Sequence, residues 1–373
     1  DDDIRDYLPA IPSYGSPITV RHLLNHTSGL RDYLVLMSLS GKRDDDFYTD
    51  EDVVDMVARQ EELNFTPGEQ HLYSNTGYFL LSQMVAVVSG TSLREFAAQR
   101  IFGPLGMSHT HFHDDHSHVV PMRASGYAAG DGGEYRISMT TLGMVGDGGV
   151  FTSVDDLLQW ERFFYSHPAA RSPSERPAEF WRFMLTRGVL NNGDTLNYAL
   201  GLGHGEYRGL EVVSHGGGFV GFRAQIMRFP QERFSVICLC NVNVANPSAF
   251  ARQIADLYLA DRMLPRDEPT AGGRATDESS GESQPQPLSP GQQLEYTGSY
   301  HSRELDADYE ILIDGTELSL RVGNHLDGAL RLSATDEMRR QAITLRFERG
   351  GDGQITGFRL DAGRVKNLRF TRQ

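Results

Sequence analysis

Two short stretches of the chain combine residue types that can carry out acyl-transfer chemistry. The first is Tyr73-Ser74-Asn75, which follows the turn at residues 66–69 and directly precedes an expected helix. A tyrosine and an asparagine at such a corner can both face one cleft. A phenol beside a cation can ionise and act as a general base, and an asparagine amide can orient a substrate amide. The plain structural alternative is a helix N-cap at Asn75 behind a packed Tyr73.

The second stretch is His215-Gly216-Gly217-Gly218, which follows an expected strand. Glycines at this place let a substrate backbone lie close along the strand edge. The Gly218 N–H could point at a developing oxyanion, and His215 could hold a substrate carboxylate or relay a proton. Taken alone, the glycine cluster also fits a turn or a bulge.

The elements that must position these stretches follow from hydrophobic periodicity and capping signals. Helices are predicted around residues 53–57 behind Thr49 or Asp50, and over residues 76–89, 93–102 and 247–262. Strands are predicted at residues 211–214, 222–229 and 234–241, the last mostly apolar and therefore expected to be central and covered on both faces. Antiparallel strands with helices before and after them predict an α/β (α+β) fold, in which an antiparallel sheet is covered by helices.

The carboxyl-terminal part of the chain changes composition twice. Residues 265–291 are rich in Pro, Gly, Ser, Glu and Gln, which predicts a disordered linker. Beyond it, short alternating segments with a hairpin signal at Asp314-Gly315 predict a small antiparallel β-barrel of about 80 residues. The chain is therefore expected to consist of a domain at 1–264, a linker at 265–291 and a barrel domain at 292–373.

Composition narrows the possible partners. The net charge of −15 argues against a nucleic-acid-binding surface, which would be basic. The longest apolar run, residues 78–88, is too short and too interrupted for a membrane span of about 18 residues.

Cys238 and Cys240 are the only cysteines and are not expected to pair. The chain opens with three aspartates and no Met, so we expect a truncation that removed any targeting segment.

Together, the two stretches resemble motifs of a known family. Tyr73-x-Asn75 and His215-x-Gly217 stand in the order of the Y-x-N and K-T-G (or H-x-G) motifs of the penicillin-recognising serine hydrolases, which include class C β-lactamases and D-alanyl-D-alanine peptidases. The resemblance covers about residues 17–260, and the tail resembles the lipocalin-like β domain appended to some members. Other segments that resemble the family are Leu23-Leu24-Asn25-His26-Thr27-Ser28-Gly29-Leu30, Phe65-x-Pro67-Gly68, Pro104-Leu105-Gly106-Met107 and Gly146-Asp147-Gly148-Gly149-Val150-Phe151-Thr152-Ser153.

The resemblance implies an enzyme that cleaves amide or ester bonds through an acyl-enzyme, with no metal or organic cofactor. It implies that Tyr73 is the general base, Asn75 a polar substrate contact, His215 the third-motif residue and Gly218 an oxyanion donor. The implied partner is a small-molecule or peptide substrate, namely a D-amino-acid peptide, an ester or a β-lactam, and the choice among them stays open. It also implies a secreted or periplasmic protein.

The first motif of that family, S-x-x-K, is absent from the chain. Only two lysines occur, and Leu39 stands three residues before Lys42 while Gly363 stands three before Lys366. In the family the motif lies a few dozen residues before the segment that residues 1–9 resemble. We therefore expect the nucleophile to precede this chain, the chain itself to be inactive, and Tyr73 to stay neutral at pH 7. The alternative is a pseudoenzyme that binds peptides or β-lactams.

A histidine cluster supports a third hypothesis. His111-Phe112-His113-Asp114-Asp115-His116 fits the H-x-H-x-D-H pattern and so resembles the zinc motif of metallo-β-lactamases, with His109 and His118 extending the cluster. A zinc hydrolase is therefore an alternative. A solvated His-rich loop is the competing interpretation, because the cluster follows residues 104–107, which resemble the serine family.

Overall fold

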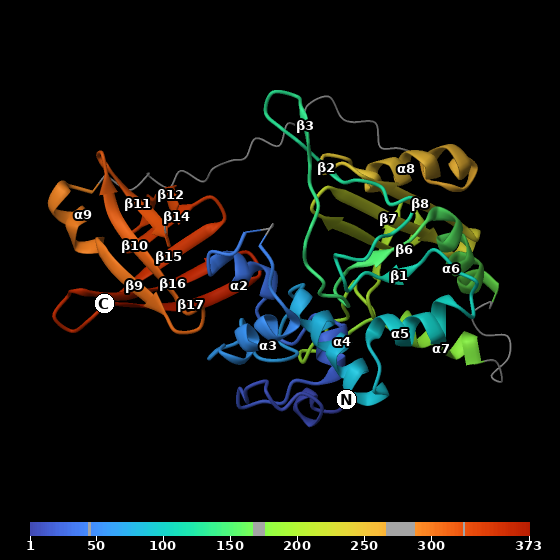
Figure 1. Cartoon of the computed structure of the whole chain (residues 1–373), viewed down its shortest axis with the longest axis horizontal. Helices are drawn as coiled ribbons and strands as arrows, with labels where there is room; N and C mark the ends of the chain where they lie inside the picture. Colours follow the sequence, from blue (N-terminus) through green and yellow to red (C-terminus); the bar gives the residue numbers. More distant parts are fainter. Residues whose placement is uncertain (44–45, 167–175, 266–287, 324) are drawn as a thin grey trace.

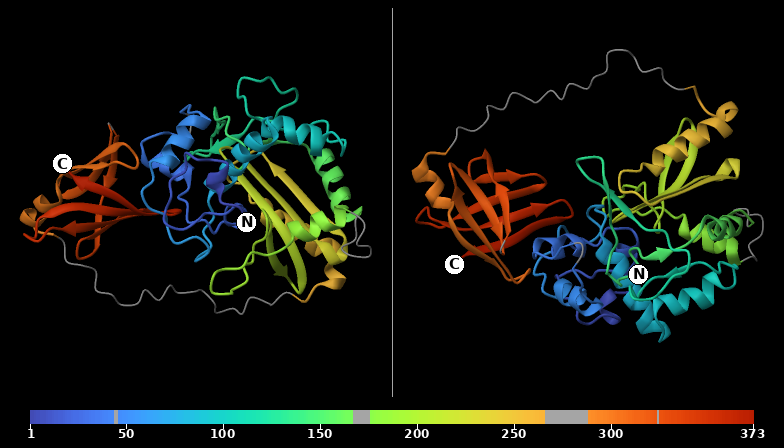
Figure 2. Two further views of the ribbon diagram at one scale, coloured as in Figure 1. Left: turned by 90° about the horizontal axis from the view of Figure 1, so that it is seen from below. Right: turned by 45° about the horizontal axis from the view of Figure 1, so that its top comes forward.

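The computed structural model describes residues 1–43, 46–166, 176–265, 288–323 and 325–373. Two large β-sheets stand on opposite sides of the amino-terminal helices, as Figures 1 and 2 show. The sheet formed by the carboxyl-terminal residues (orange to red) lies against the side of α2 (Tyr33–Leu39), and the second sheet (olive) lies beyond α4 (Asn75–Ser89). The predicted α/β (α+β) class and the predicted barrel are confirmed.

Local capping explains where several helices begin and end. Thr49 caps α3 (Asp50–Ala58) through a capping box with Asp52, and α4 ends at Gly90, whose φ of 72° suits glycine. None of the helices in the described ranges has the length and apolar character needed to cross a bilayer. The remaining helical segments are η1 (Ile4–Asp6), α1 (Val20–Leu24), α5 (Leu93–Ala97), η2 (Ala98–Phe102), α6 (Val154–Ser166), α7 (Arg176–Met184), η3 (Pro230–Glu232), α8 (Pro247–Tyr258), η4 (Ala260–Arg262) and α9 (Pro290–Tyr296).

The third predicted helix is not α-helical to its end. After α5 the chain makes the π-helical segment η2, in which the Gly103 N–H bonds to the Ala98 carbonyl at 2.9 Å. This bond spans five residues where an α-helix spans four, so the last turn is wider than the predicted continuous helix.

The second sheet has four antiparallel strands in the order β5-β6-β7-β8. Its strands are β5 (Gly203–Tyr207), β6 (Leu210–Phe219), β7 (Phe222–Phe229) and β8 (Phe234–Cys240). β6 is longer than predicted, because it continues through the glycine cluster to Phe219. Two small ladders accompany this sheet, β1 (His111–Phe112) with β4 (Val150–Phe151), and β2 (Tyr127–Ala129) with β3 (Tyr135–Ile137).

One prediction for this sheet is wrong in detail. The apolar strand β8 stands at the edge of the described sheet and not at its centre, and its Leu239 is 41% exposed. In α8 the buried side chains are Pro247, Ala251 and Ala255, while Leu257 is 80% exposed. The helix therefore lies against the sheet through small residues, and much of its bulkier apolar side faces outward.

The carboxyl-terminal sheet has nine antiparallel strands and nearly closes into a barrel, in the order β12-β11-β10-β9-β17-β16-β15-β14-β13. Alternate side chains such as Tyr309, Ile311 and Leu320 are buried inside it, as the alternating pattern predicted. Its strands are β9 (Gly298–Ser302), β10 (Ala307–Asp314), β11 (Glu317–Val322), β12 (His325–Ala329), β13 (Arg331–Ala334), β14 (Glu337–Arg340), β15 (Ile343–Arg349), β16 (Ile355–Ala362) and β17 (Val365–Arg372).

The carboxyl-terminal part differs in two details from the prediction, which consisted of strands alone. The helix α9 precedes β9, and its Ser289 side chain caps it through a box with Gln292. The hairpin turn after β10 is Gly315-Thr316, one residue later than predicted, because Asp314 still pairs with Glu317. Most of the predicted linker, residues 266–287, lies outside the described ranges.

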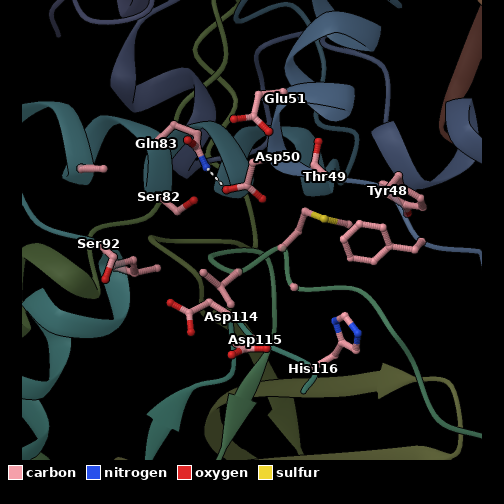
Figure 3. Close-up of a pocket in the computed structure, with 16 residues that line it drawn as sticks. Tyr48, Thr49, Asp50, Glu51, Ser82, Gln83, Ser92, Asp114, Asp115 and His116 are labelled. Carbon is pink, nitrogen blue, oxygen red and sulfur yellow. Dashed lines mark hydrogen bonds between the residues drawn. The ribbon is translucent and has the colours of Figure 1, made fainter. Parts of the chain in front are cut away.

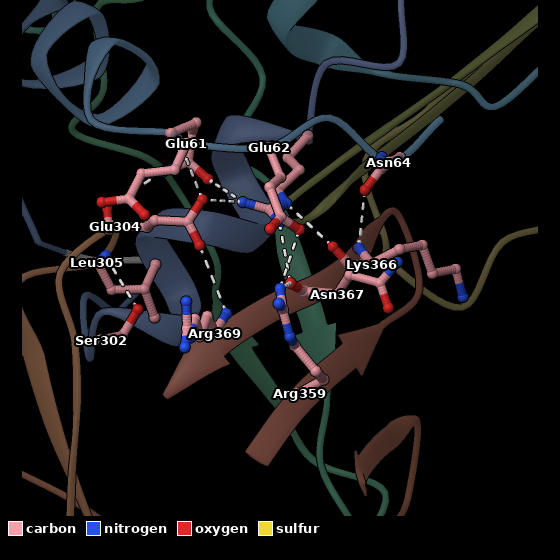
Figure 4. Close-up of polar contacts among 12 residues, drawn as sticks. Glu61, Glu62, Asn64, Ser302, Glu304, Leu305, Arg359, Lys366, Asn367 and Arg369 are labelled. Carbon is pink, nitrogen blue, oxygen red and sulfur yellow. Dashed lines mark hydrogen bonds and ion pairs between the residues drawn. The ribbon is translucent and has the colours of Figure 1, made fainter. Parts of the chain in front are cut away.

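A buried ion pair joins the barrel to the helices that precede it. The guanidinium of Arg31 contacts the Glu304 carboxylate at 2.5 Å, and their side chains are 0% and 4% exposed. Arg31 also donates to the Gln60 side chain and to the carbonyls of Lys366 and Asn367. Figure 4 shows this contact region, in which the Glu304 carboxylate also accepts from the backbone N–H groups of Glu61 and Arg369.

Removing one charge of this pair should destabilise the folded chain strongly. In Glu304→Gln the Arg31 charge would stay buried without its counter-charge, which costs about 3–5 kcal/mol of the free energy of unfolding. Urea unfolding followed by fluorescence measures the loss. The matched control is Glu310→Gln, because Glu310 pairs with Arg321 at 2.7 Å on the exposed face of the barrel, where such a pair contributes below about 1 kcal/mol. Equal losses in both variants would contradict the assignment of Arg31–Glu304 as the stabilising contact.

A carboxyl group beside α2 has an unusual proton affinity. The Tyr33 hydroxyl donates a hydrogen bond to Asp147 Oδ2 at 2.9 Å, which joins α2 to the loop before β4. Burial, reinforced by the neighbouring carboxylates Asp32 and Asp50, raises the pKa of Asp147 to about 7. The folded state therefore favours the protonated form of this carboxyl group.

The stability of the fold should depend on pH through this group. A carboxyl whose pKa is raised on folding stabilises the fold at low pH, and this contribution is lost as pH rises from about 4 to about 7. The loss is at most about 1.4 kcal/mol per pH unit. We expect the difference in unfolding free energy between wild type and Asp147→Asn to fall across that window. Asp115→Asn serves as control, because the Asp115 carboxyl is exposed and its pKa is lowered. A flat difference curve for Asp147→Asn would refute the raised pKa.

Candidate active site

Tyr73 lies in the segment that leads into α4, where it packs against His26. The two rings have centroids 4.0 Å apart, and the Ser74 N–H donates to His26 Nδ1 at 3.2 Å. His26 is 2% exposed and has a φ of 55°, in the left-handed region. From the sequence, His26 is part of a family-like segment and has no predicted role of its own. The feature of the sequence that could have drawn attention to His26 is its position shortly after the end of α1.

A hydrogen-bond chain connects His26 to His215 through Tyr198. The Tyr198 hydroxyl is 3.2 Å from His26 Nε2 and 3.3 Å from His215 Nε2. Since His26 Nδ1 accepts from Ser74, its Nε2 carries the proton and donates to Tyr198. His215 Nδ1 donates to the Gly216 carbonyl at 2.7 Å, so His215 Nε2 accepts from Tyr198. All proton positions in the chain are therefore mutually consistent with two neutral histidines.

The electrostatics of the cluster agree with this proton assignment. Burial is the largest cause that lowers the pKa of His26, to about 3, and burial also lowers the pKa of His215. Burial raises the pKa of Tyr73, and the charge of Arg364 offsets only part of that effect. The expectation that Tyr73 is a neutral phenol at pH 7 agrees with this direction.

Asn75 is the first residue of α4 and is held by Asp32. Its N–H and its Nδ2 both donate to Asp32 Oδ2, each at 2.9 Å. The same carboxylate accepts from the N–H groups of Leu34 and Val35, where it caps α2. One Nδ2–H of Asn75 is thus committed to the protein, which leaves its carbonyl oxygen and its second Nδ2–H as groups it can offer to a ligand.

His215 and Tyr73 line one cavity of about 540 Å³, together with Tyr198 and Gln225. Their ring centroids are 6.3 Å apart, so the structure brings the two predicted stretches together. Gly218 lines a different cavity, of about 220 Å³, beside Leu34. It shares the strand β6 with His215 but does not line the cavity of Tyr73 and His215.

The edge of β6 is open beside this cavity. β5 pairs with β6 only as far as Ser214, which faces Gly203. From Gly216 to Phe219 the strand is exposed, while its other edge pairs with β7. An extended chain could therefore lie along the glycine stretch, in the manner of an added strand.

A second pocket, of about 510 Å³, lies between α3, α4 and the loop after β1 (Figure 3). Its lining carries the carboxylates of Asp50, Glu51, Asp114 and Asp115, and Gln83 donates to Asp50 at 2.9 Å. None of the predicted site residues Tyr73, Asn75, His215 and Gly218 lines it. It is therefore separate from the cluster around His26.

The histidines of the zinc-like pattern do not all converge. His111 and His113 are in contact at 3.2 Å between Nε2 and Nδ1, and His113 stacks on Phe151. His116 instead packs against Phe47 and lines the acidic pocket. Within the described ranges, no group of three or more His, Cys, Asp or Glu side chains is arranged to hold a metal ion.

Comparison with known proteins places this geometry in a family. The family model described as Beta-lactamase matches residues 1–261. A D-aminopeptidase of Cereibacter sphaeroides is 29% identical over 246 residues, which are 66% of this chain and 46% of that protein. Penicillin-binding protein 4* of Bacillus subtilis is 32% identical over 256 residues, which are 65% of this chain and 54% of that protein. The chain thus spans about half the length of these curated relatives.

Solved structures share the fold. The octameric penicillin-binding protein homologue from Pyrococcus abyssi has a TM-score of 0.59 at 22% identity, over 100% of this chain and 82% of that one. A D-stereospecific amidohydrolase from Streptomyces sp. has a TM-score of 0.57 at 24% identity, over 70% of this chain and 79% of that one. With the family match covering residues 1–261, the chain belongs to the β-lactamase family of serine hydrolases, among relatives of the penicillin-binding-protein type.

Proposed function

We propose that the chain carries the substrate site of a serine hydrolase that cleaves amide bonds of D-amino-acid peptides through an acyl-enzyme. The observation that carries the proposal is the hydrogen-bond chain from His26 through Tyr198 to His215, with the Tyr73 ring packed at a tilt against His26. It joins the start of α4 to the open edge of β6, where an extended substrate can lie. The names of the relatives, D-aminopeptidase and D-stereospecific amidohydrolase, support the D-amino-acid preference over esters and β-lactams.

In this proposal each predicted residue keeps a role. Tyr73 takes a proton from the nucleophile, which requires a cation close enough to lower its raised pKa. Asn75 presents its carbonyl oxygen to the substrate. His215 accepts a hydrogen bond from Tyr198 and is the last member of the hydrogen-bond chain that begins at His26. Gly218 donates its N–H to the oxyanion from the exposed end of β6. The barrel at 292–373 is a second unit that is docked on the hydrolase unit at 1–264.

The nucleophile is proposed to come from outside residues 1–373. Neither Lys42 nor Lys366 follows a serine by three residues, so the S-x-x-K pattern does not occur in the sequence. Residues 1–373 alone would then bind a substrate but would not form an acyl-enzyme with it. A natural binding protein for peptides or β-lactams is the alternative, and fluorophosphonate labelling of a protein that also includes the segment before residue 1 separates it from an enzyme.

Tyr73→Phe should reduce turnover by about 10²-fold or more in a protein that includes the serine, because the variant cannot accept the proton. Tyr135→Phe is the control, because Tyr135 is 63% exposed and lies on β3 away from the cluster. Turnover of a D-amino-acid amide and labelling with a fluorophosphonate are the measurements. Residues 1–373 alone should remain unlabelled. Near-normal turnover of Tyr73→Phe, or stoichiometric labelling of residues 1–373, would count against the proposed roles.

The zinc hypothesis has its own test. Because His116 lies apart from His111 and His113, we expect purified chain to retain no stoichiometric zinc after gel filtration. Elemental analysis of wild type and His113→Ala measures it. One zinc per chain that disappears in His113→Ala would favour a metal centre and displace the serine mechanism.

A further inference from the structure

Tyr198 stands between the two predicted stretches of the candidate site. It lies just before β5, where its carbonyl accepts from the Gly188 N–H at 2.9 Å and its backbone forms a bridge with Gly203. The same loop lies against α4, since a Cβ at Gly201 would come within 3.2 Å of the Tyr78 hydroxyl. The backbone that carries the Tyr198 side chain is therefore held on both sides.

The hydrogen bonds through Tyr198 run in one direction, from backbone to backbone. They begin at the Ser74 N–H, which donates to His26 Nδ1, and pass from His26 Nε2 to the Tyr198 hydroxyl at 3.2 Å. They continue from that hydroxyl to His215 Nε2 at 3.3 Å and end at the Gly216 carbonyl. Ser74 precedes α4 and Gly216 lies on β6, so three side chains join these two elements. Hydrogen bonds aligned in a chain strengthen one another.

The direction of the chain assigns opposite tautomers to the two histidines. His26 carries its proton on Nε2, and His215 carries its proton on Nδ1. Burial raises the pKa of Tyr198, so the phenol keeps the proton that it donates. Protonating His215 would place a second N–H on the Tyr198 oxygen, and the hydroxyl hydrogen would lose its acceptor in the chain. The hydrogen-bond pattern thus holds both rings neutral.

The surroundings favour the same neutral rings. Burial is the largest cause that lowers the pKa of His26, of His71 and of His215. The guanidinium of Arg364 lies over the Tyr73 ring, with 4.7 Å between Cζ and the ring centroid. Its charge lowers the pKa of His26 further.

The turn that carries this guanidinium is held in place. Gly363 and Arg364 form the two-residue turn between β16 and β17. The Asn64 side chain clamps the turn, because it donates to the Arg364 carbonyl at 2.9 Å and accepts from the Lys366 N–H at 2.7 Å. The positive charge near the histidines is therefore a fixed one.

We infer that Tyr198 is a positioning residue of the hydrolase site, which selects the tautomer of His215 and fixes the start of α4 relative to the open edge of β6. The inference rests on the proposed function and deepens it, because Tyr73 and Gly218 act from these two elements. Both ring nitrogens of His215 are engaged within the protein. His215 therefore acts through the backbone of β6, and it neither holds a substrate carboxylate nor relays a proton.

NMR of the histidine rings in residues 1–373 tests the tautomers without any activity. In protein with isotope-labelled histidine the ring spectrum shows which nitrogen carries the proton, and His26→Gln and His215→Gln assign the two rings. We expect His26 to be protonated on Nε2 and His215 on Nδ1, each as a single neutral form at pH 7. The opposite tautomer in either ring, or a charged His215, overturns the inference, and the wild-type spectrum alone is enough to show it.

Tyr198→Phe removes the hydroxyl and keeps the ring. We expect His215 to populate both tautomers in this variant, because the Gly216 carbonyl is then the only remaining partner in the chain that selects Nδ1–H. Tyr165→Phe is the matched control, since Tyr165 is also half-buried and its hydroxyl donates to the Phe234 carbonyl on β8 at 2.9 Å. An unchanged His215 spectrum in a folded Tyr198→Phe variant contradicts the inference.

Kinetics of a protein that includes the serine test the positioning role. Tyr198→Phe should lower kcat about 10-fold or more with a smaller change in KM, because a displaced base or oxyanion donor costs turnover more than binding. A raised KM with kcat intact would make Tyr198 a substrate-binding residue and overturn the positioning role. If the wild-type protein turns over no D-amino-acid amide, the proposed function fails and the positioning role fails with it, whereas the tautomer assignment stands.

Discussion

The carboxylate of Asp32 is the point on which three parts of the molecule converge. It is 0% exposed, caps α2 and accepts two hydrogen bonds from Asn75 at the start of α4. Arg364 reaches it from the barrel. A buried charge is tolerated only when donors surround it, so the two helix N-termini must meet here. That constraint fixes the direction in which Tyr73 enters the site.

The aromatic and histidine cluster meets a second requirement, which is to keep polar atoms buried without charge. His26, Tyr198 and His215 satisfy one another in a single consistent set of hydrogen bonds. Because these rings are neutral, the electrostatic potential around them is set by the few charged groups nearby. The proton affinity of Tyr73 depends in such surroundings on where a cation is placed, and the cation over its ring, Arg364, belongs to the barrel.

The features that could be predicted from the sequence are those that depend on residues close together along the chain. The cap of α3, the alternation in the barrel strands and the stretches around Tyr73 and His215 all follow from local patterns, whereas the N-cap of α4 is Ser74 and not Asn75. The roles of His26 and Arg364 do not, because their contacts with Tyr198 and Asp32 span 172 and 332 residues. The edge position of β8 was also missed, since an apolar strand can be covered by helices without having strands on both sides.

The two-residue turn between β16 and β17, Gly363-Arg364, has a consequence for how the surroundings of Tyr73 can diverge in related proteins. Its scaffold is held by Asn64 and Arg31 through backbone atoms, so the identity of the residue at the tip is not constrained by the clamp. A single codon change at the tip could replace a cation with an acid or an apolar group without touching α4 or β6. The group that lies over the Tyr73 ring would then vary on the barrel, while the segments α4 and β6 stay unchanged.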